Sequence, residues 1–247
     1  MPIYQGLATI YDNLMESVDY REWAQYIKNF TEKYGQETGN VLDLACGTGN
    51  TSIALAEQGW RVTGVDISQP MLQQARKKAA QAKKDIIFLQ QDMRDLVLTR
   101  EYDLVTCFQD GLNYLLTKED LARTFGNIYQ AVRMDGLFIF DLNLVEKYSF
   151  SAQGDINFID TEDFSLVYET FYHPGENIWE IKVTGFIRDD QHYVKFQEIH
   201  REKQHNLEEV KDTLRVTGFK VLDVFHAFSQ DPPSADSRRI FIIAQKG

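Results

Sequence analysis

The sequence contains little cysteine, few basic residues and no long apolar run, and each shortage excludes a class of protein. Two cysteines in 247 residues cannot form the disulfide framework of a small secreted domain, so we expect a reducing cytosol. The 26 Lys and Arg against 37 Asp and Glu leave a formal charge of −11, which disfavours a nucleic-acid partner because binding phosphates requires a basic face. No segment approaches the ~20 apolar residues of a membrane span, and no signal peptide is recognisable. The expected protein is cytoplasmic, with no membrane partner.

Several catalytic and binding motifs are missing as well. The five histidines lack metal-ligand spacing, so no metal site is expected. Neither a Gly-x-Ser-x-Gly elbow nor a Cys–His nucleophile pair is present, which leaves hydrolase chemistry unsupported. No Gly-Lys-Ser/Thr sequence is present, and this excludes a phosphate-binding P-loop. The chain is nevertheless long enough for one domain with a substantial core and an insertion.

Residues 41–66 contain the most informative pattern in the chain. An apolar run beginning at Val41 predicts a buried parallel strand, and Gly47 and Gly49 free the backbone for a sharp turn and the close approach of a ligand. A helix and a second strand follow, and Asp66 ends that strand. Strand, glycine turn, helix, strand and terminal acid together predict the first β-α-β unit of a nucleotide-binding sheet.

The glycine turn suits a nucleoside without phosphates. A dinucleotide-binding loop has the pattern G-x-G-x-x-G. Here Ala45 replaces the first glycine of such a series, and Ser52 occupies the sixth position counted from Gly47. Asp43, just before the turn, would repel a phosphate but could accept hydrogen bonds from an ammonium or from backbone N–H groups. The loop therefore favours a positively charged nucleoside.

These residues resemble the motifs of the class I S-adenosylmethionine-dependent methyltransferases. The resemblance covers about residues 36–145 and the closing strands near the C-terminus, and Ala45 departs from the commoner glycine of the family. It implies S-adenosyl-L-methionine as cofactor and a Rossmann-like α/β fold. Five segments match in order: 42–49 (Leu-Asp-Leu-Ala-Cys-Gly-Thr-Gly), 64–68, 90–93, 102–108 and 133–141.

The cofactor contacts are expected at the ends of the first four strands and in the N-terminal helices. Asp66 would accept both ribose hydroxyls, and Ile67 and Met71 would cover the faces of the adenine ring. Asp92 would accept from the adenine amino group, while the Met93 N–H would donate to a ring nitrogen. Either aspartate could instead be a helix cap. The remaining expected contacts are Asp43, Ala45, Gly47, Gly49, Phe108, Tyr11, Tyr20 and Trp23, of which the last three could be ordinary core residues.

Candidates for catalysis and acceptor binding follow the fourth and fifth strands. Methyl transfer needs few catalytic side chains, because the sulfonium is already a good leaving group and alignment supplies most of the acceleration. A general base helps only where the nucleophile starts protonated. The catalytic candidates are Asp110, Asn113 and Asn143, and the family resemblance implies that Asn113 and Tyr114 lie beside the transferred methyl group. Asp110 could instead cap a helix, and Asn143 could be only a turn residue. Gln109 and Asp141 lie at the same strand ends.

The order of the elements predicts an α/β protein with a Rossmann-like seven-stranded methyltransferase sheet. Residues 1–145 and 206–247 would form the cofactor-binding domain, and 150–205 a small antiparallel β insertion after the fifth strand. The insertion is expected to be a three-stranded meander within about 156–203. Other expected elements are strands near 40–45, 61–66, 86–90, 102–107, 136–142, 221–228 and 239–244, and helices near 6–16, 20–34, 51–58, 69–82, 118–132 and 206–217.

The insertion is where we expect substrate choice, because ligands of open α/β sheets lie beyond the carboxyl ends of the strands. Tyr168 and Tyr172 of its aromatic stripe would bind the acceptor or cage a cation. These rings could instead pack the insertion against the main body, and the insertion could serve as a homodimer surface.

We therefore expect an S-adenosylmethionine-dependent methyltransferase that acts on a small-molecule methyl acceptor. Nitrogen is slightly favoured over oxygen, by resemblance to glycine- and aminosugar-methylating enzymes. The alternatives are an RNA- or protein-modifying methyltransferase and a non-catalytic S-adenosylmethionine-binding protein.

Overall fold

The computed structural model describes residues 3–144 and 155–247. Within them, the central sheet has seven strands in the order β10-β11-β5-β4-β1-β2-β3. Strands β1 to β5 are parallel, and β11 is antiparallel to both β5 and β10. The predicted fold class is confirmed. The strands are β1 (Asn40–Leu44), β2 (Arg61–Asp66), β3 (Ile87–Gln90), β4 (Tyr102–Cys107), β5 (Val132–Asn143), β10 (Phe219–His226) and β11 (Arg239–Lys246).

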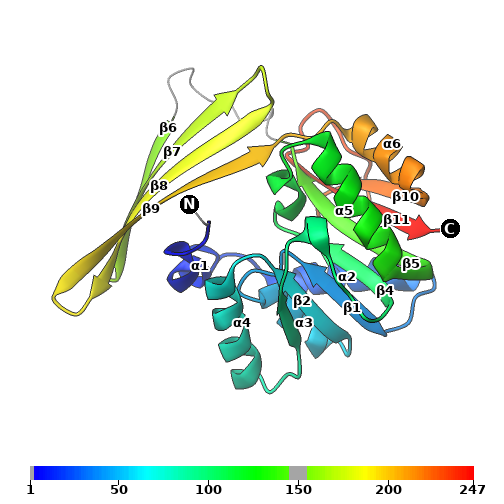
Figure 1. Ribbon diagram of the computed structural model, residues 1–247, viewed down its shortest axis with the longest axis horizontal. Coiled ribbons are helices and arrows are strands. Elements are labelled where there is room, and N and C mark those ends of the chain that lie inside the picture. The colour runs from blue at the N-terminus through cyan, green and yellow to red at the C-terminus, as the bar shows by residue number, and fades with distance from the viewer. Residues whose placement is uncertain (1–2, 145–154) are drawn as a thin grey trace.

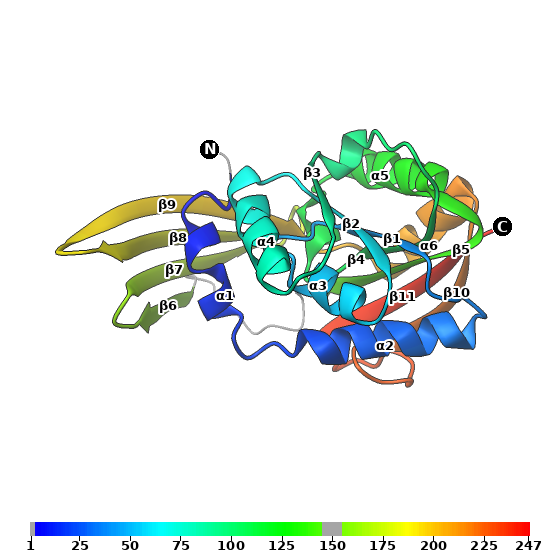
Figure 2. The same ribbon diagram turned by 90° about the horizontal axis from the view of Figure 1, so that it is seen from below.

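Helices cover both faces of this sheet (Figure 2). One apolar core packs α2 (Tyr20–Lys33) and α3 (Asn50–Glu57) against the sheet, and a second core packs α5 (Lys118–Ala131) and α6 (Leu207–Thr217) against the other face. Helix α4 (Gln69–Gln81) lies against β2 and β3. Because both faces are covered, the parallel strands are nearly continuous apolar runs.

The strand order reverses between β1 and β4. The chain moves outward from β1 through β2 to β3 and then returns to the other side of β1 as β4. Asp43 near the end of β1 is thereby flanked by Gly64 of β2 and Thr106 of β4. In open α/β sheets the crevice at such a reversal receives the ligand.

The N-terminal segment differs from the expected helix over 6–16. It forms a 3-10 turn, η1 (Leu7–Thr9), and a short helix, α1 (Tyr11–Leu14). The carboxylate of Glu198 on a distant strand accepts the backbone N–H groups of Tyr4 and Gly6. These tertiary hydrogen bonds hold the chain in an irregular path, and a sequence pattern does not reveal them. Two further 3-10 turns are η2 (Met93–Asp95) and η3 (Gly111–Tyr114).

The insertion is a four-stranded antiparallel sheet within the described residues, not the expected three-stranded meander. The additional edge strand carries exposed Ile156 and Phe158, so no buried apolar face marks it in the sequence. Residues 150–154 of the predicted insertion lie outside the described residues. In order, the strands are β6 (Asp155–Asp160), β7 (Phe164–His173), β8 (Ile178–Asp189) and β9 (His192–Lys203).

This second sheet extends away from the central sheet, and β9 leads back to the main body and α6 (Figure 1). The N-terminal segment lies between the second sheet and α4 (Figures 1 and 2). Leu7 and Ile10 of that segment pack against Phe164, Leu166 and Val183 of the second sheet. The insertion and the N-terminal segment therefore meet over the carboxyl ends of the central strands. No helix in the described ranges is long and apolar enough to cross a membrane.

Candidate active site

A cavity of about 210 Å³ lies where the strand order reverses. Its wall combines the glycine turn after β1, the ends of β2, β3 and β4, and the N-terminal segment. It brings together most of the residues that the sequence nominated for cofactor binding, together with Tyr4, Arg94 and Gln109. The nominated residues in its lining are Tyr11, Tyr20, Asp43, Ala45, Gly47, Asp66, Ile67, Met71, Asp92, Met93, Phe108 and Tyr114.

The turn after β1 has three residues in left-handed conformation. Ala45, Gly47 and Gly49 have φ of 52°, 54° and 79°. Ala45 thus adopts a conformation that favours glycine. Gly49 lies outside the cavity lining. A Cβ at Gly49 would lie 2.9 Å from the Cβ of Ala75, so its small size serves the packing of α4.

Asp66 ends β2 in the wall of the cavity and is 9% exposed. Its Oδ2 accepts the backbone N–H of Gly47 at 2.8 Å, and its Oδ1 accepts that of Ser68 at 2.8 Å. Burial raises the pKa of Asp66, while these two N–H groups act in the opposite direction. Each oxygen can accept a further hydrogen bond. The carboxylate is therefore fixed in direction and retains acceptor capacity toward the cavity.

Asp43 lies deeper, and both of its oxygens are already hydrogen-bonded. Oδ2 accepts the Ser52 hydroxyl at 2.5 Å, and Oδ1 accepts the Thr106 hydroxyl at 2.9 Å. Burial raises the pKa of Asp43 to about 6, against the lowering effect of the two hydroxyls. Asp43 thus links β1, α3 and β4 beneath the cavity.

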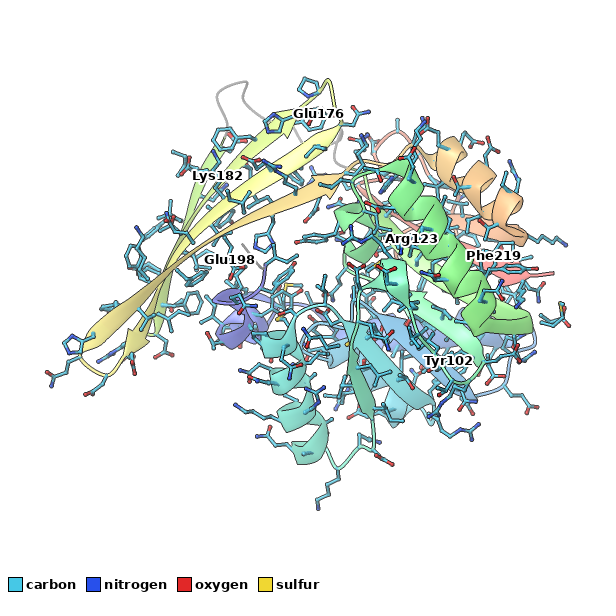
Figure 3. The ribbon with its side chains drawn as sticks, viewed as in Figure 1. Tyr102, Arg123, Glu176, Lys182, Glu198 and Phe219 are labelled. Atoms are coloured by element: carbon cyan, nitrogen blue, oxygen red, sulfur yellow. The ribbon has the colours of Figure 1, made fainter. Side chains whose placement is uncertain are left out.

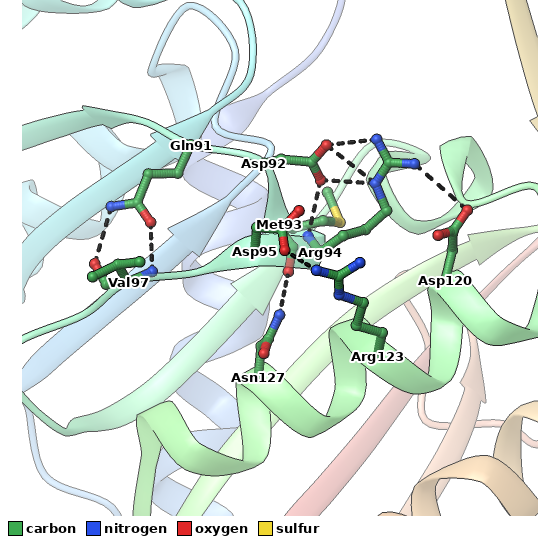
Figure 4. Close-up of polar contacts among 9 residues, drawn as sticks. All are labelled: Gln91, Asp92, Met93, Arg94, Asp95, Val97, Asp120, Arg123 and Asn127. Carbon is green, nitrogen blue, oxygen red and sulfur yellow. Dashed lines mark hydrogen bonds and ion pairs between the residues drawn. The ribbon is translucent and has the colours of Figure 1, made fainter.

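Asp92, after β3, is paired with Arg94 (Figure 4). The Arg94 Nε lies 3.0 and 3.1 Å from the two carboxylate oxygens of Asp92, and its Nη2 lies 2.5 Å from Oδ2. This guanidinium holds the pKa of Asp92 below its ordinary value. Arg94 also reaches Asp120 at 3.5 Å and lines the cavity itself. Arg94 was not among the residues selected from the sequence. Its position two residues after Asp92, across a short turn, could have indicated this ion pair.

Asn113 and Asn143 are joined to each other outside the cavity lining. The Asn113 Nδ2 donates to the carbonyls of Asn143 at 3.2 Å and Lys203 at 2.9 Å, and its Oδ1 accepts the Asn143 N–H at 3.1 Å. Asn113 is 0% exposed. Its amide is occupied by the ends of β5 and β9, so we infer a structural role for it, and its expected roles in catalysis and acceptor binding stay predictions. Asn143 likewise belongs to this junction.

Three aromatic candidates also lie away from the first cavity. Trp23 packs edge-on against Phe108 and Phe241 in the core beneath α2. Tyr168 packs in the apolar cluster between the second sheet and the N-terminal segment, and the Tyr172 hydroxyl donates to Asn177 at the exposed β7–β8 turn. Tyr168 is therefore used for packing and Tyr172 lies at an exposed turn, so neither lines the cavity.

A second cavity of about 200 Å³ adjoins the first. Among the described residues, four line both cavities: Tyr4, Tyr11, Gln109 and Tyr114. The remaining wall of the second cavity includes Trp23, Asp110, Glu202 and Arg239. Gln109 and Asp110 have φ of 58° and 67°, a strained conformation for residues other than glycine and one often found at functional sites. The shared residues form the boundary between the two cavities.

Strand β9 contributes polar residues that the sequence analysis did not select. Glu198, His200 and Glu202 alternate along one face and are 3%, 3% and 7% exposed. The Tyr114 hydroxyl lies 2.6 Å from the Tyr4 hydroxyl and 3.1 Å from His200 Nδ1, and His200 Nε2 lies 3.2 Å from Glu198. The period of two in Glu-x-His-x-Glu was the available signal, because alternate residues of a strand share a face.

Two polar junctions hold the N-terminal segment over the cavity. Glu198 extends from β9 toward this segment (Figure 3) and accepts the N–H groups of Tyr4 at 2.8 Å and Gly6 at 2.6 Å. At the other end, the Asp12 carboxylate accepts the Thr48 hydroxyl at 2.6 Å and Lys78 Nζ at 2.7 Å. The first junction fastens the segment to the second sheet, and the second fastens it to the glycine turn and α4.

The cavity also contains a buried polar atom without a partner. The Gln109 Nε2 is buried and has no hydrogen-bond partner among the described residues, and the buried Tyr20 hydroxyl interacts with Asn50 and Gln109 beside it. Buried polar groups in native proteins are nearly always paired, so the Gln109 Nε2 fits a ligand with a polar group at this end. At the rim, Ile67 is 50% exposed and lies beside buried Met71, which suits a flat apolar ring. These features fit an adenosine that carries a polar tail.

Comparisons with known proteins agree with this geometry. Residues 41–136 match the family described as methyltransferase domain. The Bacillus subtilis protein YqeM, provisionally named a methyltransferase, is 37% identical over 246 residues, which cover 99% of this chain and 97% of YqeM. A crystal structure of an S-adenosylmethionine-dependent methyltransferase from Clostridium acetobutylicum is 28% identical with a TM-score of 0.88, and the match covers 100% of both chains.

The name of a third relative includes its substrate. The Streptomyces fradiae dTDP-3-amino-3,6-dideoxy-alpha-D-glucopyranose N,N-dimethyltransferase is 28% identical over 139 residues. The match covers 55% of this chain and 53% of the relative. The similarity to this enzyme is therefore confined to about half of each protein.

Proposed function

The chain belongs to the S-adenosylmethionine-dependent methyltransferases, and from this premise we propose that it methylates the nitrogen of a small-molecule amine. The observation that carries the proposal is the charge of the second cavity. Its wall includes the carboxyl groups of Asp110 and Glu202. Arg239, the cation in its lining among the described residues, is already paired with Asp110 at 2.9 Å and with buried Asp141. Glu202 is thus a carboxyl group in this wall without a cationic partner among the described residues, which favours an amine of modest size as the acceptor.

S-adenosyl-L-methionine is the cofactor, and we propose that the first cavity holds it. When bound, it supplies a methyl group on a sulfonium, which is already a good leaving group. Asp66 would accept the ribose hydroxyls, Ile67 and Met71 would contact the adenine faces, and Asp92 would accept from the adenine amino group. The unpartnered Gln109 Nε2 and the neighbouring Tyr20 hydroxyl would bind the polar end of the methionine.

The side chains at the boundary of the two cavities would align the acceptor. Tyr4, Tyr11 and Tyr114 line both spaces, so an acceptor in the second cavity would face the transferred methyl group between them. Aromatic faces attract a cationic group, and the N-terminal segment above them excludes water. Alignment and desolvation of this kind supply most of the acceleration that methyl transfer needs.

The alternatives receive less support. An RNA substrate is disfavoured by the charge of −11 and by the acidic second cavity. The partial match to an amino-sugar N,N-dimethyltransferase favours nitrogen over oxygen. A non-catalytic cofactor-binding protein would share the first cavity but would not need a second one beside it.

The division of the chain and its cellular setting also belong to the proposal. We propose that residues 1–145 and 206–247 bind the cofactor and that 150–205 act as a lid and substrate subdomain. Cys46 and Cys107 are free and buried, which supports a reducing cytosol. Exposed Ile156, Phe158 and Ile199 share one face of the second sheet and support the use of this sheet as a homodimer surface.

The experiment is methyl transfer from labelled S-adenosylmethionine to a defined panel. The amines are glycine, ethanolamine, putrescine and a dTDP-amino sugar, and the matched hydroxyl compounds are glycolate, ethylene glycol, butanediol and the corresponding dTDP-sugar. Total tRNA and unfractionated protein complete the panel. The proposal predicts label in an amine and not in its hydroxyl counterpart. Label that enters only hydroxyl compounds, tRNA or protein would contradict it.

A further inference from the structure

Strand β9 places a carboxyl group at the acceptor side of the boundary between the cavities. Glu202 lines the second cavity and does not line the first. It lies two residues beyond His200, on the face of β9 that packs against η3 and the N-terminal segment. The insertion thus contributes an acidic side chain to the acceptor cavity, in addition to covering it.

The surroundings of Glu202 differ from those of Asp110, the other carboxyl group in this wall. Asp110 forms an ion pair with Arg239, whose Nη1 lies 2.9 Å from its Oδ1. Glu202 has no ion pair among the described residues and is 7% exposed. The titratable and charged groups that face it come from the N-terminal segment, α1, η3 and β11: Tyr4, Tyr11, Asp110, Tyr114 and Arg239. Glu202 is therefore the carboxyl group left available for a cationic ligand.

We propose that Glu202 is the proton acceptor of the reaction, binding the ammonium group of the acceptor and removing one proton before the nitrogen attacks the methyl group. This inference rests on the proposed methylation of an amine. An ammonium nitrogen has no free electron pair, so an amine that arrives protonated needs a base at this point.

The step balances in atoms and charge. One N–H bond of the ammonium breaks, and the proton passes to a carboxylate oxygen of Glu202. The freed electron pair forms the bond from nitrogen to the methyl carbon, and the carbon–sulfur bond breaks with its pair remaining on sulfur. The charge lost by the sulfonium reappears on the methylated ammonium, and the carboxylate and the original ammonium neutralise each other.

The environment of Glu202 suits this exchange. Burial raises the pKa of Glu202 to about 8, the negative charge of Asp110 adds to the rise, and the Tyr114 hydroxyl opposes it. An ordinary glutamate has a pKa near ~4.3 and would be a much weaker base toward an amine. An arriving ammonium would favour the ionised carboxylate through its opposite charge.

The chain of hydrogen bonds beside Glu202 has a positioning role. Tyr114 stands next to Glu202 and is held by Tyr4 and His200 at 2.6 and 3.1 Å. His200 is in turn held by Glu198 at 3.2 Å. These contacts keep the Tyr114 ring at the boundary of the cavities, where it limits the direction from which the acceptor nitrogen approaches.

The test compares two cofactor analogues by calorimetry on the full chain. Sinefungin carries an amine in place of the methylated sulfonium, whereas S-adenosylhomocysteine has neither the methyl group nor the amine. The Glu202→Gln variant should bind sinefungin at least ~10-fold more weakly than wild type, with S-adenosylhomocysteine changed less than ~2-fold, because a charge-assisted hydrogen bond is lost. In wild type, the preference for sinefungin should grow as the pH rises toward about 8 and the carboxyl group ionises, and it should stay flat in the variant.

Glu162→Gln, on the exposed β6–β7 turn, is the matched control and should leave both affinities unchanged. Should Glu202→Gln fail to fold, Glu202→Asp keeps the acid and should retain a pH-dependent preference. An unchanged ratio of sinefungin to S-adenosylhomocysteine affinity in Glu202→Gln, or a flat pH profile in Glu202→Asp, would overturn the inference alone. Wild-type protein that binds neither analogue would overturn the cofactor site and the proposed function with it.

Discussion

At the scale of the residue, three aspartates near strand ends line the same cavity but differ in the groups that hold their carboxylates. Hydroxyl groups surround Asp43, backbone N–H groups fix Asp66, and the guanidinium of Arg94 holds Asp92. The sequence predicts the position of all three because each follows an apolar run. It does not predict their partners, since Thr106 is 63 residues from Asp43 along the chain. The positions of these acids could therefore be predicted from the sequence, whereas their hydrogen-bond partners could be identified only in the structure.

Asn113 was expected to take part in catalysis, but in the structure its side chain is hydrogen-bonded to backbone groups. Its amide joins η3 to β5 and β9 through three hydrogen bonds to backbone groups. We expect Asn113→Ala to lower the free energy of unfolding by about 2–4 kcal/mol, because buried backbone groups lose their partners. Urea titration followed by circular dichroism measures this loss, and calorimetry should show little change in S-adenosylmethionine affinity of the folded fraction.

The control for this variant is Asn157→Ala, an exposed position on β6. It should change the free energy of unfolding by less than about 0.5 kcal/mol. If Asn113→Ala were as stable as wild type but lost methyl transfer, the assignment of a structural role would be wrong and a catalytic one would be restored.

The raised pKa of Glu202 leads to a prediction about how the stability of the protein changes with pH. Its folded pKa of about 8 lies above that of an unfolded glutamate, so the folded chain holds a proton that the unfolded chain has released. This contribution to stability is full below the unfolded pKa and is lost as the pH rises through about 8. We therefore compare the free energy of unfolding of Glu202→Gln with that of wild type. The difference, variant minus wild type, should rise by at most ~1.4 kcal/mol per pH unit and then level off. Denaturant titrations across this range would contradict the buried carboxyl group if the difference fell or stayed constant.

At the scale of the element, the β1–turn–α3–β2 unit was predictable because its signals are local. An apolar strand, the turn glycines and a terminal acid all fall within one short stretch. The N-terminal segment and β9 were not, because contacts across long sequence separations determine their paths. Glu198 bonds to Tyr4, 194 residues away, and this bond replaces the regular helix expected there. The alternation in β9 indicated a strand but not that its polar face would be the buried one.

The junction of β9 with the N-terminal segment should control access to the cofactor cavity. Although burial alone raises the pKa of Glu198, hydrogen bonds from His200 and the N–H groups of Gly6 and Tyr4 hold it below its ordinary value. We expect Glu198→Gln to speed S-adenosylmethionine dissociation by ~3- to 10-fold, because the charge-assisted bonds to the segment weaken. Stopped-flow fluorescence measures the rate, and amide hydrogen exchange at residues 4–7 should rise with it.

Glu180→Gln provides a matched control on the same sheet. Glu180 is also buried in β8, but it pairs with Arg201 at 2.8 Å and does not touch the N-terminal segment. Its replacement should leave the dissociation rate near that of wild type. Equal effects of the two variants would show that Glu198 acts on the sheet in general and not on the segment over the cavity.

At the scale of the whole molecule, three parts of the chain meet at the carboxyl edge of the central sheet and form the two cavities. The central sheet supplies the strand ends, the N-terminal segment supplies a cover, and the second sheet supplies Glu198, His200 and Glu202. Family resemblance and alternation of elements predicted the sheets, but a sequence does not state that an insertion folds back over the first residues of the chain. That meeting places the second cavity, with Asp110 and Glu202 in its wall, beside the first.

We propose that the cavity at the reversal of strand order binds the adenosine of S-adenosylmethionine through Asp66. Calorimetric titration of S-adenosylmethionine into wild type, Asp66→Ala and the exposed control Asp85→Ala tests it most directly. We predict that Asp66→Ala weakens binding by ~10- to 100-fold while Asp85→Ala binds as wild type does, since two charge-assisted hydrogen bonds are lost only in the first. An affinity of folded Asp66→Ala equal to that of wild type would contradict the account.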